Sequence, residues 1–180
     1  VYTTQDVGAN GADFTDSDVN STGVSQIVTL TPGQNDLSID AGVYTPAAIG
    51  DRVWEDTNAN GRQDPTETGG IANLLVRLRD CLNGDAIVAT TTTDATGNYS
   101  FTGLRPGQYK VEFVTTTGLV LSVQDAVIAN DGTDSDASPV TGLTGCYTLN
   151  SGDNNITVDA GIYRPASLGD RLWVDTNGDG

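Results

Sequence analysis

Apolar and polar residues alternate along much of this chain with a period of two, which is typical of β-strands that have one buried face. In residues 74–79 and 109–113, every second side chain is apolar. The pattern, with short apolar runs, places further strands at residues 48–54, 86–93, 98–102, 118–123, 145–149 and 155–161. No window has the 3.6-residue period of an amphipathic helix. The alternation therefore predicts an all-β protein.

Turn-forming residues separate the predicted strands, for example at Asn83-Gly84-Asp85 and at Thr96-Gly97-Asn98. These residue types favour tight turns because Gly tolerates positive φ, while Asn and Asp side chains bond to nearby backbone groups. About seven or eight short strands connected by such turns are typical of an antiparallel β-sandwich of the immunoglobulin-like kind.

The chain also contains an internal repeat. Residues 49–58 read Ile-Gly-Asp-Arg-Val-Trp-Glu-Asp-Thr-Asn and return at 168–177 as Leu-Gly-Asp-Arg-Leu-Trp-Val-Asp-Thr-Asn. Asp-Ala-Gly-Val-Tyr at 40–44 returns as Asp-Ala-Gly-Ile-Tyr at 159–163, again 119 residues later. So many matches in the same order indicate tandem copies of one domain.

The repeat divides the chain into three parts. We expect the C-terminal part of a preceding repeat at 1–44, one complete repeat at 45–163, and the start of a following repeat at 164–180. The links between repeats are short and contain Pro46 and Pro165, which restricts hinge motion and favours a stiff rod. We interpret the chain as a window on a longer tandem array.

Composition narrows the possible functions. The 24 acidic residues outnumber the 8 basic ones, so the net charge is -16, and there is no His. Such a chain repels nucleic acid and anionic membranes, and it lacks the commonest general base. No apolar stretch approaches the roughly 20 residues of a membrane-spanning helix. All but three of the acids are Asp, which indicates either oxygen ligands for a hard cation or a solvated acidic surface.

Residues 56–67 match the spacing D-x-[DN]-x-[DN]-G-x5-E of a calcium-binding loop. Gly61 permits the sharp turn that lets side-chain oxygens converge on a cation. Because a predicted strand precedes the loop and Gly69-Gly70 follows it, we expect an EF-type loop on a β scaffold. The alternative is a polar turn without metal. The candidate ligands are Asp56, Asn58, Asn60, Arg62 through its carbonyl, Asp64 and Glu67, and Asp175, Asn177 and Asp179 begin the same loop in the next copy.

A second cluster of carboxylates recurs in both copies. Carboxylates crowded into one short segment repel each other, and a divalent cation would relieve that repulsion. The alternative is a solvated loop of Asx turns. The residues are Asp131, Asp134 and Asp136 with their counterparts Asp13, Asp16 and Asp18, and Asp51 and Asp125 could join them from elsewhere in the fold.

Residues 49–61, 69–78, 91–109 and 159–163 resemble the B repeats of serine-aspartate repeat (Sdr-type) surface proteins, which are similar to the collagen-adhesin B (Cna-B-like) domain. This resemblance implies a small sandwich that serves as a stalk on bacterial surfaces. It also implies that the repeats bind calcium, stiffen with it and hold a functional region away from the cell. The calcium role would fall on the ligands of loop 56–67.

The two cysteines and the two tryptophans lead to further structural predictions. An extracellular setting permits a disulfide, so we expect Cys81 and Cys146 to form a bridge within the domain. Two buried thiols or a link between chains are the alternatives. Trp54 and Trp173 recur in the repeat, and we expect them to pack in the core or between repeats rather than to stack on carbohydrate.

Three functions remain in competition. The first is a non-catalytic structural repeat of a secreted or surface-displayed protein, a calcium-stiffened stalk, fibre or extracellular filament. Its partners would be neighbouring repeats of the same chain and other copies, without nucleic acid or membrane insertion. The second is an adhesive module that binds a protein or glycan, and the third is an accessory domain of a secreted enzyme. Catalysis by this region is not expected, because G-x-S-x-G, a triad His and a phosphate loop are all missing.

Overall fold

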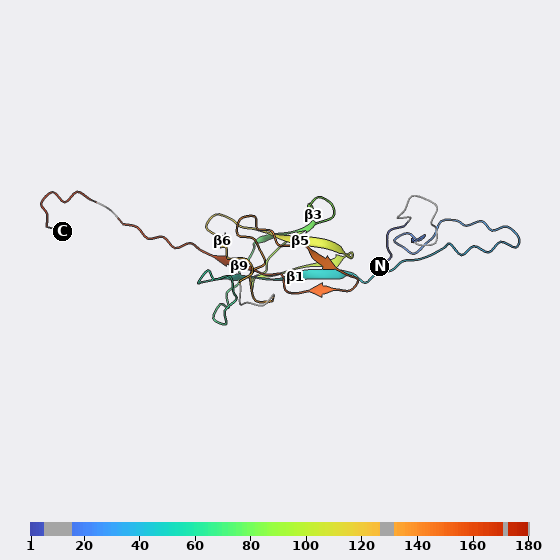
Figure 1. The fold of residues 1–180 in the computed structure, drawn as a ribbon, viewed down its shortest axis with the longest axis horizontal. Helices are drawn as coiled ribbons and strands as arrows, with labels where there is room; N and C mark the ends of the chain where they lie inside the picture. Colours follow the sequence, from blue (N-terminus) through green and yellow to red (C-terminus); the bar gives the residue numbers. More distant parts are fainter. Residues whose placement is uncertain (6–15, 127–131, 171–172, 180) are drawn as a thin grey trace.

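The computed structural model describes residues 1–5, 16–126, 132–170 and 173–179, and its centre is a sandwich of two β-sheets (Figure 1). The strands are β1 (Ala47–Glu55), β2 (Leu75–Asp80), β3 (Ala86–Thr92), β4 (Asn98–Leu104), β5 (Gly107–Val114), β6 (Val120–Leu121), β7 (Tyr147–Leu149), β8 (Asn154–Asn155) and β9 (Ala160–Tyr163). One sheet has the order β4-β1-β9-β6, with β8 also on β1, and the other has the order β3-β2-β5-β7. The predicted all-β sandwich is confirmed. The described residues include no helix long and apolar enough to cross a membrane.

The alternating segments supply the core between the sheets. Val76 and Leu78 of β2 are fully buried, as is Val111 of β5, which pairs with Leu78. The intervening side chains point outward, where Arg79 and Glu112 form an ion pair of 2.7 Å. The period of two therefore sorted core from surface correctly in both strands.

The first sheet is mixed, which the prediction of a wholly antiparallel sandwich did not include. β1 pairs antiparallel with β4 but parallel with β9, with Val53 opposite Ala160 and Glu55 opposite Ile162. Parallel neighbours need a long crossover, and here nearly the whole repeat separates the two strands. Sequence alternation reports which face is buried, and it carries no information on which strand lies alongside.

The strand predicted over 155–161 is interrupted. β8 ends at Asn155, whose Oδ1 accepts the N–H of Thr157 at 2.9 Å and its hydroxyl at 3.0 Å. This local side-chain bond competes with strand pairing and turns the chain. β9 then begins at Ala160.

The expected disulfide joins Cys81 to Cys146. Cys81 directly follows β2 and Cys146 directly precedes β7, and these strands flank β5 in the second sheet. The bridge therefore links two strands that are not hydrogen-bonded to each other.

Residues 1–44 contain a local motif that the complete repeat also has. Gln5 pairs in parallel with Ser17, and Gln124 pairs in the same way with Ser135. Both Gln side chains then donate to the carbonyl of the residue after the serine, at 2.9 and 3.0 Å. The two copies therefore share conformation here as well as sequence.

The flanking segments lie at opposite ends of the sandwich. Figure 1 shows residues 164–170 leaving one end as an extended chain, while most of residues 16–44 lies beyond the other end. Chain entry and chain exit are consequently separated by the length of the domain.

Candidate calcium site

The loop 56–67 leaves the end of β1 and is closed at its base by backbone pairing. The N–H of Glu55 donates to the carbonyl of Gly69 at 3.0 Å. Gly70 is required at this crossing because a Cβ there would lie 2.0 Å from the carbonyl oxygen of Thr96. Gly70 thus lets the returning chain pack closely on the sheet.

Asp56, the first candidate ligand, is fully buried. Its N–H donates to the carbonyl of Ile162 in β9 at 2.9 Å, and its carboxylate accepts the N–H groups of Gly61 at 2.8 Å and of Asn60 at 3.3 Å. Gly61 has a φ of 76°, and a Cβ there would lie 2.2 Å from the carbonyl oxygen of Val123. The sharp turn predicted at Gly61 is present, and its surroundings admit only glycine.

The next candidates meet on one carboxylate. The side-chain Nδ2 atoms of Asn58 and Asn60 donate to Oδ2 of Asp64 at 2.9 and 3.1 Å. Their Oδ1 atoms accept backbone N–H groups of Asn60 and Arg62 at 3.0 and 2.7 Å. The residues at positions 3, 5 and 9 of the loop are therefore brought together, as the spacing requires.

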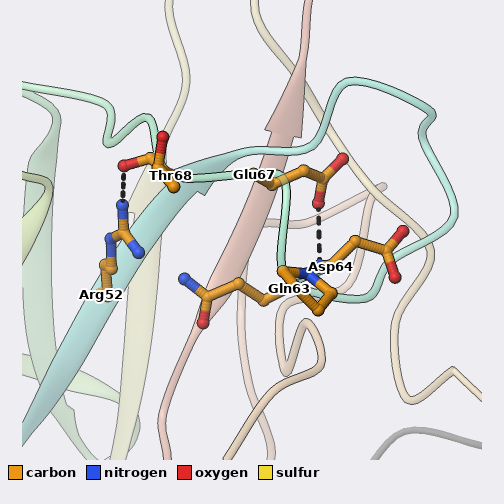
Figure 2. Close-up of a pocket in the computed structure, with 6 residues that line it drawn as sticks. Arg52, Gln63, Asp64, Glu67 and Thr68 are labelled. Atoms are coloured by element: carbon orange, nitrogen blue, oxygen red, sulfur yellow. Dashed lines mark hydrogen bonds between the residues drawn. The ribbon is translucent and has the colours of Figure 1, made fainter.

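Glu67, at the twelfth position, reaches back across the loop and is only 4% exposed. One carboxylate oxygen accepts the N–H and hydroxyl of Thr57 at 2.7 and 2.9 Å, and the other accepts the N–H of Asp64 at 3.2 Å (Figure 2). Among the described residues, no ion pair links Glu67 or Asp56 to a basic side chain. Two buried carboxylates thus rest on N–H and hydroxyl dipoles alone, which is a costly arrangement without a cation.

A cavity of about 340 Å³ lies beside the loop. The guanidinium of Arg52 stands at its rim, where it donates to the carbonyls of Thr68 at 2.5 Å and Thr96 at 3.2 Å. Figure 2 shows the Arg52 side chain directed to Thr68 rather than to Glu67. The lining residues are Arg52, Gln63, Asp64, Pro65, Glu67 and Thr68.

The second acidic segment runs alongside the loop. Arg62 and Asp134 face each other in an antiparallel bridge, and the N–H of Ser135 donates to the carbonyl of Gly61 at 3.0 Å. The two clusters, about 70 positions apart in the sequence, therefore form one continuous region.

Asp136 is buried and faces a second buried carboxylate, Asp159. The carboxylate of Asp136 accepts the N–H of Asp159 at 2.6 Å and the hydroxyl of Tyr147 at 2.9 Å. Asp159 accepts the N–H of Arg52 at 3.1 Å, while its Oδ2 has no hydrogen-bond partner. Burial, followed by the charge of Asp51, raises the pKa of Asp159 to about 8.

Asp159 was not among the candidate ligands predicted from the sequence, although the repeat pattern pointed to it. Asp159 recurs as Asp40 in the Asp-Ala-Gly motif. The preceding copy repeats the contact, because the carboxylate of Asp18 accepts the N–H of Asp40 at 2.6 Å. A recurring Asp next to a strand, paired with an acid of the second cluster, could have been included on that ground.

The remaining predicted residues of the second cluster are partly described. Asp51 is half-buried, and burial raises its pKa. Asp16 and Asp18 each have a buried Oδ1 without a hydrogen-bond partner. Asp125 has a φ of 49° and donates its N–H to the carbonyl of Ser135 at 2.9 Å, beside the cluster. Asp13 and Asp131 lie outside the described residues.

The third copy contributes only the beginning of a loop. Asp175 accepts the N–H groups of Asn177 and Gly178 at 3.2 and 2.7 Å, and Asn177 Nδ2 donates to Asp179 at 2.6 Å. All of these residues are exposed. The local turn of Asp175 to Asp179 matches the first turn of loop 56–67.

Calcium fits the donor chemistry of loop 56–67, which consists of carboxylate and amide oxygens. Within the described ranges, no three His, Cys, Asp or Glu side chains lie close enough together to hold a metal ion. The loop meets the requirement for residue type and order, while Asn58 and Asn60 present nitrogen rather than oxygen to Asp64.

Comparison with known proteins identifies close relatives. The family model of the SdrD B-like domain matches residues 47–162. Serine-aspartate repeat-containing protein D of Staphylococcus aureus is 42% identical over 166 residues, which are 91% of this chain and 12% of the relative. Serine-aspartate repeat-containing protein F of Staphylococcus epidermidis is 40% identical over 186 residues, 99% of this chain and 11% of the relative.

Solved structures give more distant similarities. GBS52, the minor pilin of Streptococcus agalactiae, has a TM-score of 0.44 at 12% identity, covering 80% of this chain and 61% of its own. The shaft pilin SpaA of Lactobacillus rhamnosus GG has a TM-score of 0.38 at 11% identity, covering 69% of this chain and 52% of its own. None of the relatives named here is described as an enzyme.

Proposed function

Because this chain belongs to the SdrD B-like domain family, we propose that it is a non-catalytic structural repeat of a protein displayed outside the cell, stiffened by calcium into a stalk or filament. The observation that carries the calcium part is the pair of buried carboxylates, Asp56 and Glu67, in a twelve-residue loop without a basic partner. The chain spans about an eighth of the relatives it matches, so the activities of the whole protein are proposals as well.

In the proposed site, each loop position contributes a different kind of oxygen ligand. Asp56 and Glu67 would supply two buried charges, and the half-buried Asp64 would supply a third charge. Asn58 and Asn60 would contribute amide oxygens, which requires their side chains to turn relative to Asp64. Arg62 would contribute its carbonyl, and Asp175, Asn177 and Asp179 would play the corresponding roles in the following copy.

We propose a second cation site in the adjoining acidic region. Asp134, Asp136 and Asp51 would join Asp159, whose buried Oδ2 lacks a partner. A cation there would favour the charged form of Asp159, against the burial that now raises its pKa. Asp131 belongs to the proposal by sequence, and Asp13, Asp16 and Asp18 are its counterparts in the preceding repeat.

Calcium would stiffen the domain because the loop is bonded to several distant segments. Asp56 bonds to Ile162 of β9, and Gly61 bonds to Ser135. A cation that orders the loop would thereby hold the end of β1, the acidic segment and the exit strand in one arrangement. Such a cation binds the folded state selectively and stabilises it by mass action.

The test is thermal unfolding with calcium and with a chelator. We expect chelation to lower the Tm. When calcium had been present at a hundred times its Kd, its removal lowers the free energy of unfolding by about 2.7 kcal/mol. The double variant Asp56→Asn with Glu67→Gln should lose this difference and at least one calcium by calorimetry. The control variant, Asp36→Asn with Asp94→Asn, removes the same charge elsewhere. It should keep both the Tm difference and the full number of bound calcium ions. An unchanged Tm after chelation of a calcium-loaded sample would contradict the proposal.

A further inference from the structure

The joint between residues 1–44 and the complete repeat is separate from the calcium loop. β1 begins beside the joint at Ala47 and ends beside the loop at Glu55. The eight steps from Ala47 to Glu55, at about 3.3 Å each, place the two regions roughly 26 Å apart. The joint and the loop therefore lie at opposite ends of β1.

The linker at this joint has little conformational freedom. The N–H of Tyr44 bonds within the preceding segment at 2.8 Å. The next residue, Thr45, donates its N–H to the hydroxyl of Ser151 at 2.9 Å and accepts the N–H of Gly152 at 3.0 Å, both in the turn that follows β7. Pro46, whose ring restricts φ, leads directly into β1. Every linker residue is thus bonded or restricted in conformation.

A second turn contacts the preceding segment itself. Arg105, between β4 and β5, donates from Nη1 to the hydroxyl of Thr4 at 2.5 Å. Pro106 stiffens this turn, and the hydroxyl of Tyr109 donates to the carbonyl of Arg105 at 3.0 Å. A hollow of about 270 Å³ at this contact is lined by Thr3, Thr4, Tyr44, Arg105 and Pro106.

We propose that these two turns, 105–107 and 150–153, form a clamp that fixes the orientation of the preceding repeat without calcium. One contact holds the linker and the other holds the body of the segment, so together they oppose both bending and twisting at the joint. The clamp rests on the tandem organisation in the proposed function and not on its calcium site.

The test measures ¹⁵N relaxation in the whole 180-residue chain, with calcium and with chelator. In the unmodified chain, amides of residues 2–5 and 38–44 should have the same ratio of transverse to longitudinal rates as those of β1, β2 and β5. Arg105→Ala should lower the ratio for the preceding segment only. Thr4→Val, which removes the acceptor and keeps the shape, should do the same. Thr92→Val, an exposed position on β3, is the matched control and should change nothing.

The outcomes separate the clamp from the calcium proposal. Unchanged ratios in both Arg105→Ala and Thr4→Val would overturn the clamp and leave the calcium site untouched. A preceding segment that already moves independently in the unmodified chain would also overturn it. If chelation alone releases the segment while amides of β1 keep their shifts, calcium sets the joint and the clamp is wrong. Retained coupling after chelation, lost on Arg105→Ala, supports it.

Discussion

Gly61 shows how one residue can be required by two separate constraints. Its φ is positive, which most residues avoid, and its Cα faces the carbonyl of Val123 at a distance that excludes a side chain. The first constraint was predictable from the loop spacing. The second was not, because Val123 is distant in sequence and its approach depends on the tertiary fold.

Replacing Gly61 by Ala should destabilise the domain more than replacing Gly84 by Ala. Both positions have positive φ and share a strain of about 1–2 kcal/mol, but a Cβ at Gly84 meets no atom within 4 Å. The difference between the two variants in urea unfolding therefore measures the clash at Val123. Equal losses of unfolding free energy would mean that the loop does not approach Val123 so closely.

Asp159 should make the calcium-free domain less stable as the pH rises. Its pKa is about 8 in the folded state, against an ordinary value near 3.8, so the folded state retains a proton that the unfolded state releases. Its contribution is complete below pH 4, declines as the pH rises, and is lost near pH 8. The negative charges of Asp51, Asp136 and Asp134 contribute, after burial, to this raised pKa of Asp159.

The check is chemical unfolding between pH 4 and pH 9 in chelator, for the unmodified chain and for Asp159→Asn. The variant cannot ionise, so its stability should decline less over this range. Parallel curves for the two proteins would show that Asp159 does not carry the effect.

At the scale of strands, the sequence-based prediction agrees with the structure for features that depend on side-chain burial alone. The alternation in β2 and β5 located the core because each side chain reports its own face. The break between β8 and β9 was missed, since it comes from Asn155 bonding to Thr157 rather than from hydropathy. The parallel β1–β9 pair was missed because strand order depends on contacts between distant segments.

The disulfide links two strands, and its contribution to the free energy of unfolding can be measured. It closes a loop of 65 residues, for which the chain-entropy model gives about 4 kcal/mol. Cys81→Ser with Cys146→Ser should lose about that much unfolding free energy in denaturant titration, and reduction of the unmodified chain should match the variant. A loss near zero would mean that the folded state strains against the bridge.

For the whole molecule, the sequence predicted the family and the sandwich, and it singled out loop 56–67, whose calcium role is a proposal. It did not predict that the two acidic clusters adjoin, because their contact runs through Gly61 and Ser135. It also did not locate the joint, since Arg105 lies in an ordinary turn and its partner Thr4 belongs to another copy of the repeat. Contacts between copies leave no pattern within one copy.

The parallel pairing of β1 with β9 has a mechanical consequence. The chain enters at the start of β1 and leaves from the end of β9, so a pull on its two ends acts along both strands in opposite directions. The backbone pairing of β1 with β9, together with the bond from the N–H of Asp56 to the carbonyl of Ile162, is then loaded in shear, and its bonds do not open one after another. Under tension, such a repeat unfolds only when β1 and β9 slide past each other and their backbone bonds break together.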